Sequence, residues 1–359
     1  MHPVLYAKII GLRERLLQLR EELELRRTDL DVGSFWKTWH GKAESSHIAA
    51  GDGSFNYARR LGFWLFGATA SGVYSGCDAG DVFLGELDIL RLGDIGEDAL
   101  RALAQSGSKI MEAKALKMAG ERITGGLLLA DGALSGLFKN YTEDMGNNRI
   151  ASLAGLGPGE EERLFRWAKD IAGELPENPD GWSSWSGKDM VFSLEEDRRF
   201  SVGILMALCR KEYLATLIGL LDGNANRMVG IAKTSEECTI IEGFPDIYVL
   251  SVGTRAPGFT EPKPVELPKD EGLPELPCSF FYARLEEGYG VMRLEVFAEP
   301  EKVDPPRLLS VLLGASVSGY PYPLAKAHHM CSLSFSSLYK YLGLAGGRWE
   351  PSGREALFQ

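Results

Sequence analysis

The sequence contains few cysteines, five among 359 residues. They are scattered along the chain without a CxxC pair or any spacing typical of metal ligands, as Cys77, Cys209, Cys238, Cys278 and Cys331. This excludes a small disulfide-stapled scaffold and a cysteine-based zinc site. The pattern instead predicts reduced, mostly buried thiols in a cytoplasmic protein.

Long hydrophobic runs are also missing. No stretch reaches the roughly 18 uninterrupted apolar residues that span a bilayer, so we expect no membrane partner. The first residues lack the basic-then-apolar pattern of a secretory signal. The last residues, 353–359, read GREALFQ, which is typical of a cleaved affinity tag, and we set them apart from the fold.

Positive charge is scarce, since 39 Lys and Arg residues face 50 Asp and Glu residues, for a net charge of -11. A protein that holds duplex DNA by itself usually carries a basic surface. A role on nucleic acid would therefore need a local channel, metal ions or a partner that delivers the strand. The hydrophobic content of 45% and charged content of 25% are ordinary for a globular protein with a sizeable core.

Residues 1–32 predict an N-terminal amphipathic helix. Its apolar positions alternate at spacings of about four and three, as Leu5, Ile9, Leu12, Leu16, Leu19 and Leu23. This is a heptad seam with charged residues on the other face. Two interpretations remain open, a helix packed on its own domain or a dimer or partner contact.

The rest of the chain, residues 45–345, predicts one α/β domain. Strands are expected at about 46–55, 63–75, 83–92, 124–132, 227–235, 279–285 and 291–298, and helices at about 96–119, 160–172, 194–221, 305–317 and 323–342. This order matches an RNase H-like mixed sheet, in which an antiparallel meander joins parallel strands through a crossover helix. Residues 147–188 are expected to be a helical insertion and residues 256–277, rich in Pro and Glu, a surface loop.

Two apolar runs each lead into an Asp-Gly pair, as IAAGDG before Ser54 and LLLADG before Ala133. In an RNase H-like sheet the first and fourth strands are neighbours, so Asp52 and Asp131 would meet at the ends of their strands. Two adjacent carboxylates repel unless a cation neutralises them, and Mn²⁺ or Mg²⁺ suits oxygen ligands. The flanking glycines would let backbone or a substrate phosphate approach closely.

Each Asp-Gly pair taken alone is weak, because the dipeptide commonly marks a turn. Asp180-Gly181 and Asp222-Gly223 are each expected to mark a turn or a helix end. On the crossover helix, the segment KIMEAKAL offers Glu112 as a third carboxylate beside apolar positions. A charge so near a buried face needs a partner, and Glu121 is the competing candidate.

Four segments together resemble the NurA nuclease family over about residues 47–342: AGDGSF, LLLADGAL, VGIAKTS and above all GYPYPLAKAHHM. The resemblance implies an RNase H-like fold and a Mn²⁺-dependent DNA nuclease, a single-strand endonuclease and 5′–3′ exonuclease. It also implies a homodimer that works with a HerA-type hexameric ATPase translocase. The biological setting would be DNA end resection or degradation of foreign DNA.

The family motifs assign the metal ligands position by position. Asp52 and Asp131 match the metal-binding aspartates, and Glu112 matches the helix glutamate. His328, rather than the adjacent His329, matches the histidine of the last motif, which can bind metal or act as a general acid. Phosphodiester hydrolysis of this kind would use two Mn²⁺ or Mg²⁺ ions.

Further residues are candidates for substrate contact. Lys233 matches a family lysine that can contact the scissile phosphate, and Tyr320 and Tyr322 line the same region. Trp182 and Trp185 in GWSSW have no counterpart in the family pattern. They could stack on unpaired bases, or they could anchor the 147–188 segment onto the core.

Two other functions compete with the nuclease. An actin-like sugar kinase or ATPase also carries Asp-Gly turns around nucleotide phosphates, but the second half of the chain lacks a convincing glycine-rich phosphate loop. A catalytically silent partner subunit of a HerA-type motor would fit the acidic balance and the heptad helix. The intact set of Asp52, Glu112 and Asp131 argues against that second alternative.

Overall fold

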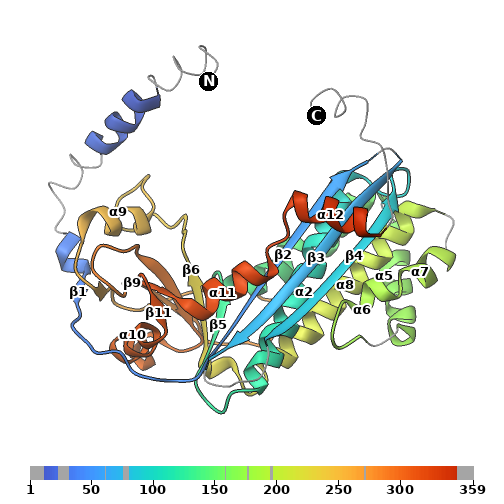
Figure 1. Ribbon diagram of the computed structural model, residues 1–359. Coiled ribbons are helices and arrows are strands. Elements are labelled where there is room, and N and C mark those ends of the chain that lie inside the picture. The colour runs from blue at the N-terminus through green and yellow to red at the C-terminus, as the bar shows by residue number, and fades with distance from the viewer. Residues whose placement is uncertain are drawn as a thin grey trace.

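The structure is a computed structural model that describes residues 12–22, 32–60, 62–75, 81–157, 159–175, 178–194, 197–270 and 272–345. These residues form one large mixed sheet with helices on both faces (Figure 1). Among the described helices, none combines the length and apolar character needed to cross a membrane. The expected tag remnant at 353–359 lies outside the described residues.

The sheet has ten strands in its described part. Its longer strands are β2 (Ile48–Arg59), β3 (Phe63–Tyr74), β4 (Val82–Arg91), β5 (Leu127–Asp131), β6 (Met228–Ala232), β9 (Ser279–Arg284) and β10 (Met292–Val296). The strand order is β1-β7-β9-β10-β6-β5-β2-β3-β4, with β1 (Lys37–Thr38) and β7 (Gly258–Phe259) at one edge and β8 (Lys263–Pro264) paired with β9. Strands β2, β3 and β4 form the antiparallel meander, and β5 runs parallel to both β2 and β6. The expected mixed sheet is confirmed.

Helices cover the two faces of the sheet. Helix α2 (Glu97–Glu121) crosses from β4 to β5 and packs on β2 and β3, with α8 (Arg198–Leu221) behind it. The other face of β2 and β3 carries α11 (Tyr322–Cys331) and α12 (Phe335–Leu344). The remaining helices are α3 (Leu134–Lys139), α4 (Asn147–Ala154), α5 (Glu160–Ile171), α6 (Ser183–Ser186), α7 (Lys188–Leu194), α9 (Asp246–Gly253) and α10 (Pro305–Gly314).

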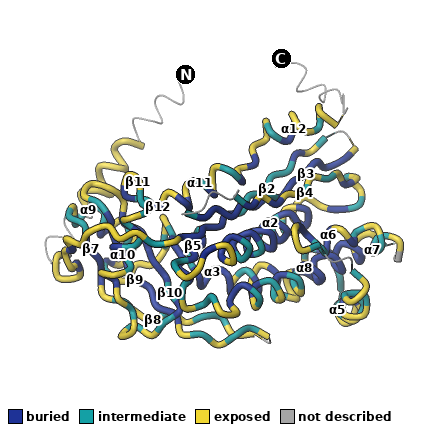
Figure 2. Tube along the Cα trace, turned by 60° about the horizontal axis from the view of Figure 1, so that its bottom comes forward, coloured by how far each residue is buried: buried dark blue, intermediate teal, exposed yellow. Residues whose placement is uncertain are grey.

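The two faces of the sheet pack into separate apolar clusters, and Figure 2 shows β3 buried along most of its length. Along β2, Ala49 joins the cluster on the α2 side, whereas Ile48 and Ala50 join the cluster on the other side. Successive side chains of a strand point to opposite faces. Asp52 therefore points to the face that carries α11.

The glycines around Asp52 make room for helix α2. A Cβ added at Gly51 would lie 2.7 Å from the Leu116 Cβ, and one at Gly53 would lie 3.0 Å from a Glu112 carboxylate oxygen. These positions admit the helix rather than a substrate phosphate, which corrects that part of the expectation. Asp52 itself is the fifth residue of the twelve-residue strand β2 and not its end, because β2 continues in register with β3 to Arg59.

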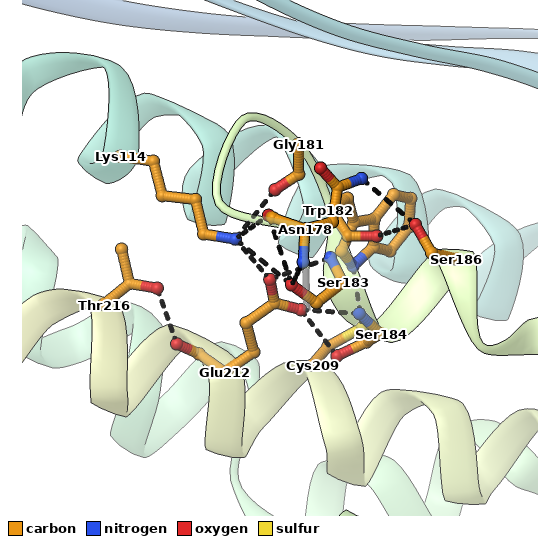
Figure 3. A network of polar contacts seen from close by, with 10 residues as sticks. All are labelled: Lys114, Asn178, Gly181, Trp182, Ser183, Ser184, Ser186, Cys209, Glu212 and Thr216. Carbon is orange, nitrogen blue, oxygen red and sulfur yellow. Dashed lines mark hydrogen bonds and ion pairs between the residues drawn. The ribbon is translucent and has the colours of Figure 1, made fainter. Parts of the chain in front are cut away.

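The 147–188 segment folds as helices packed on the same core as α8. Trp182 and Trp185 are 0% and 1% exposed, so the prediction that they stack on bases is wrong and the anchoring alternative holds. Figure 3 shows the polar network beside them, in which the Lys114 ammonium binds the Glu212 carboxylate at 2.7 Å. Glu212 also accepts hydrogen bonds from the backbone N–H groups of Ser183 and Ser184.

Two other expectations need correction. The helix predicted over 323–342 is two helices, α11 and α12, separated at residues 332–334. The Leu333 backbone in that break is bound to β2, because its N–H donates to Ser54 Oγ and its carbonyl accepts from Asn56 Nδ2. The 256–277 segment is not wholly a surface loop, because β7 and β8 pair with β9.

Residues 12–22 of the N-terminal segment are helical. Leu12, Leu16 and Leu19 are each exposed by half or more. The interpretation in which this part of the seam packs on its own domain is therefore wrong. Leu5, Ile9 and Leu23, the other seam positions, lie outside the described residues.

Candidate metal centre

Asp52 and Asp131 lie side by side on one face of the sheet. Strands β2 and β5 are parallel neighbours, with Gly51 opposite Ala130, so the next residue of each strand is an aspartate. Asp131 is the last residue of β5. The crossover through α2 fixes this register, and it brings together two carboxylates that are 79 positions apart in the sequence (131 minus 52).

His328 reaches the same place from α11. The helix is fastened across the sheet by β3, whose Ser71 and Thr69 hydroxyls donate to the carbonyls of Ala327 and Cys331 at 2.7 and 2.6 Å. The His328 Nδ1 then lies 2.7 Å from the Asp52 Oδ2. Asp52, Asp131 and His328 each offer one ligand atom, and these atoms all lie within 4.8 Å of one another.

The chemistry of this group fits a hard divalent cation. Burial and then the neighbouring Asp52 charge raise the pKa of Asp131 above its ordinary value. Burial and the same two aspartates raise the pKa of the Tyr320 hydroxyl. That hydroxyl is buried and faces the Asp131 carboxylate. Two carboxylates and an imidazole are a donor set that Mn²⁺ accepts readily.

Glu112 stands beside this group rather than within it. Its side chain is buried, and the Lys109 ammonium binds its Oε2 at 2.8 Å, one helical turn earlier. Burial raises the pKa of Glu112, and the paired Glu112 charge raises the pKa of Lys109. The charges of Asp52 and Asp131 also raise the pKa of Glu112. The competing residue Glu121 is a mostly exposed carboxylate 3.7 Å from Lys117.

Lys233 and Tyr320 lie on the Asp131 side of the group. Lys233 directly follows β6, and its ammonium is 4.0 Å from the Asp131 Oδ2 and 4.5 Å from the centre of the Tyr320 ring. The Lys233 side chain is half exposed, so it can meet a substrate. Tyr322 begins α11 with 54% of its surface exposed. The structure therefore brings Asp52, Asp131, His328, Lys233 and Tyr320 together and leaves Tyr322 at the surface.

Two residues near the aspartates were missed from the sequence. Lys109 lies three residues before Glu112, the spacing that puts two side chains on one helix face. Cys331 lies three residues after His328, and its thiol is 3.6 Å from the Asp52 Oδ2. The helical spacing could have identified both. His329, the alternative to His328, is exposed.

The family model of the NurA domain matches residues 46–333 of this chain. The DNA double-strand break repair nuclease NurA of Saccharolobus solfataricus is 26% identical over 341 residues, which cover 89% of each sequence. The probable DNA double-strand break repair nuclease NurA of Methanocaldococcus jannaschii is 29% identical over 152 residues, 35% of this chain and 38% of that protein.

Solved structures share the fold. The crystal structure of the NurA nuclease from Sulfolobus solfataricus superposes with a TM-score of 0.68 at 22% identity, over 98% of this chain and all of that one. A crystal structure of NurA bound to dAMP and manganese gives a TM-score of 0.61 at 17% identity, over 96% of this chain and 98% of that one.

Proposed function

This chain belongs to the NurA family, and from that premise we propose that it is a metal-dependent DNA nuclease, a phosphodiester hydrolase. The observation that carries the proposal is the meeting of Asp52, Asp131 and His328 within 4.8 Å. A NurA structure with manganese and a deoxynucleotide supports it. The test is DNA cleavage by the purified chain, which we expect with added Mn²⁺ and not with EDTA.

Asp52, Asp131 and His328 would hold the ion. When bound, a divalent ion supplies Lewis acidity toward a phosphodiester and lowers the pKa of water. The two carboxylates would fix its position. The His328 Nδ1 lies 2.7 Å from Asp52 Oδ2, close enough to share the ion with that carboxylate.

Lys233 would contact the scissile phosphate. Its ammonium is half exposed and 4.0 Å from the Asp131 Oδ2, and an ammonium can serve as a point donor to phosphate. The face of Tyr320 packs against that ammonium, which limits the directions the lysine can take. The buried Tyr320 hydroxyl can donate to an oxygen of the substrate.

The number of ions depends on Lys109. We propose that one ion binds among Asp52, Asp131 and His328, and that a second binds only when Glu112 exchanges Lys109 for metal. Two cations cannot share one side of a buried carboxylate without strong repulsion. Lys109→Met should therefore raise the number of Mn²⁺ ions bound per chain from about one to about two, counted by electron paramagnetic resonance.

The matched control for this count is Lys109→Met combined with Glu112→Gln. That double variant lacks the carboxylate for a second ion, so about one Mn²⁺ ion should bind. Equal counts for the wild type and Lys109→Met would overturn the role given to Lys109.

The acidic chain would meet DNA at this metal centre and through a partner. We propose that it acts as a single-strand endonuclease and 5′–3′ exonuclease beside a HerA-type hexameric ATPase, in end resection or in degradation of foreign DNA. A motor that delivers the strand removes the need for a broad basic surface, which a net charge of -11 does not supply.

A homodimer is the second assembly that we propose. Leu12, Leu16 and Leu19 form an exposed apolar seam, and such a seam is typical of helix pairing. Replacing Leu12 and Leu16 by Glu should convert the dimer to a monomer in light scattering, because two buried charges would face each other. Glu14→Lys and Glu21→Lys, on the side of the helix away from the seam, serve as the control. A dimer that survives the Leu changes would remove the seam from the contact.

A silent partner subunit would share the fold and the motor partner. It would have no need of a compact ligand group with a lysine beside it. The Mn²⁺-dependent cleavage assay separates the two functions directly.

A further inference from the structure

A buried ion pair lies behind the metal centre, on the opposite face of the sheet. Arg293 and Glu295 are two residues apart on β10, so they share one face. Both are buried, with Glu295 fully so. The Arg293 guanidinium donates to the Glu295 Oε1 through Nε at 2.9 Å and through a terminal nitrogen at 2.7 Å.

Glu295 holds the turn that follows Asp131. Its Oε2 accepts the backbone N–H of Ser135 at 2.8 Å, and its Oε1 accepts the Ser135 hydroxyl at 3.2 Å. The turn is also held from β6, where the Gly132 N–H donates to the Ile231 carbonyl at 2.9 Å. The chain from Asp131 to Ser135 is therefore bound at both of its ends.

Arg293 holds the segment that follows Lys233. One guanidinium nitrogen donates to the Ser235 hydroxyl at 3.4 Å and lies 3.5 Å from a Glu237 carboxylate oxygen. The guanidinium also lies over the Phe280 ring at 4.2 Å, which restricts its rotation. One ion pair thus contacts both segments whose first residues are Asp131 and Lys233.

We propose that the Arg293–Glu295 pair is a positioning unit that sets the separation of Asp131 and Lys233 in the metal centre, an inference that rests on the proposed nuclease function. The two side chains approach to 4.0 Å, although they leave different strands. A metal ligand and a phosphate-binding group must keep a fixed distance for catalysis, because small displacements cost large factors in rate. Neither residue of the pair touches the site itself.

The purely structural alternative is an ion pair that only stabilises the fold. The chain offers a matched control, the buried Lys114–Glu212 pair of Figure 3, which fastens α6 to α2 and α8. Lys114→Met with Glu212→Gln should lower the melting temperature and leave the Mn²⁺ affinity unchanged. Glu295→Gln should lower the melting temperature as well, but it should also weaken Mn²⁺ binding by about 10-fold or more, the scale found for groups that orient metal ligands.

A second variant separates the contact of Glu295 with Ser135 from the contacts of Arg293 with Ser235 and Glu237. In Glu295→Gln alone, the Arg293 guanidinium takes the one amide oxygen and turns the NH2 group toward the Ser135 N–H, which loses its acceptor. In Arg293→Met combined with Glu295→Gln that competition is gone, so the glutamine oxygen can accept the Ser135 N–H, while the contacts to Ser235 and Glu237 are lost. Replacing a buried ion pair by neutral groups is often tolerated, so this variant is expected to fold. We expect near wild-type Mn²⁺ affinity and a KM for single-stranded DNA raised about 10-fold, since a 1 Å misplacement alone can cost more.

The full-length chain is measured for melting temperature, for Mn²⁺ affinity by paramagnetic resonance and for KM and kcat on a single-stranded oligonucleotide. The proposal is overturned if Glu295→Gln changes Mn²⁺ affinity no more than the Lys114–Glu212 control does, or if the double variant keeps the wild-type KM. If the wild type binds Mn²⁺ yet cuts no DNA, the nuclease function fails. In that case the positioning role of Arg293 and Glu295 is still tested by comparing the Mn²⁺ affinities of the variants and their binding of uncut oligonucleotide with those of the wild type.

Discussion

Asp52→Asn should abolish Mn²⁺-dependent DNA cleavage, lowering kcat by about 10³-fold or more. The change keeps the shape of the side chain but removes one of the two negative charges that face the cation position. A metal ion contributes several kcal/mol to such reactions, and each ~1.4 kcal/mol is a factor of ten in rate. The measurement is single-turnover cleavage of a labelled oligonucleotide with Mn²⁺ in excess.

The matched control is Asp222→Asn. Asp222 also precedes a glycine, but it is exposed at the end of α8, so wild-type cleavage is expected. Equal cleavage by the wild type and Asp52→Asn preparations would trace the activity to a contaminating nuclease, and the proposed function would fail.

Asp131→Asn should be as inactive as Asp52→Asn and yet raise the melting temperature of the metal-free protein. Burial and the Asp52 charge raise the pKa of Asp131, so the ionised carboxylate opposes folding when no cation is bound. Asparagine removes that cost while it keeps the volume of the side chain. The measurement is thermal unfolding in EDTA, followed by circular dichroism.

The gain in melting temperature from Asp131→Asn should depend on pH. A carboxyl whose pKa is higher in the folded state than in the unfolded state loses stability as the pH rises between those two values. The advantage of Asp131→Asn should therefore be full above the folded-state pKa of Asp131 and shrink as the pH falls. It should vanish below the ordinary value of about 3.9. A lower melting temperature for Asp131→Asn at pH 8 would show that the two carboxylates do not repel.

The central pair could be predicted because topology and register follow from local patterns. Three short-linked strands, a helix and a buried apolar strand leave few arrangements, and the RNase H-like one puts Asp52 beside Asp131. The position of His328 came only from its motif. Its helix is held on the sheet by hydrogen bonds from the Ser71 and Thr69 hydroxyls to backbone carbonyls of α11. No local sequence pattern predicts these long-range bonds.

Other features depend on contacts between distant segments. Trp182 and Trp185 have the composition of a base-stacking surface, but their burial is decided by α2, α8 and β3, as the contact of Trp185 with Phe66 illustrates. Arg293 and Glu295 resemble the ordinary polar alternation of a half-exposed strand. The paths of the chain after Asp131 and after Lys233 give them their partners.

Helix α11 ends at Cys331, a position that the sequence analysis did not predict. A single helix was expected over residues 323–342. The break follows from Ser54 and Asn56 of β2, whose side chains bind the Leu333 backbone and so compete with helical hydrogen bonds. Ser334 then caps α12 by accepting from the Ser337 N–H.

Anomalous diffraction from crystals of the chain soaked in Mn²⁺ tests the account most directly. It predicts a manganese peak within bonding distance, about 2.0–2.3 Å, of carboxylate oxygens from both Asp52 and Asp131, with a His328 ring nitrogen completing the group. A well-ordered manganese peak elsewhere, with the two aspartates turned apart or bound to protein groups alone, would contradict it.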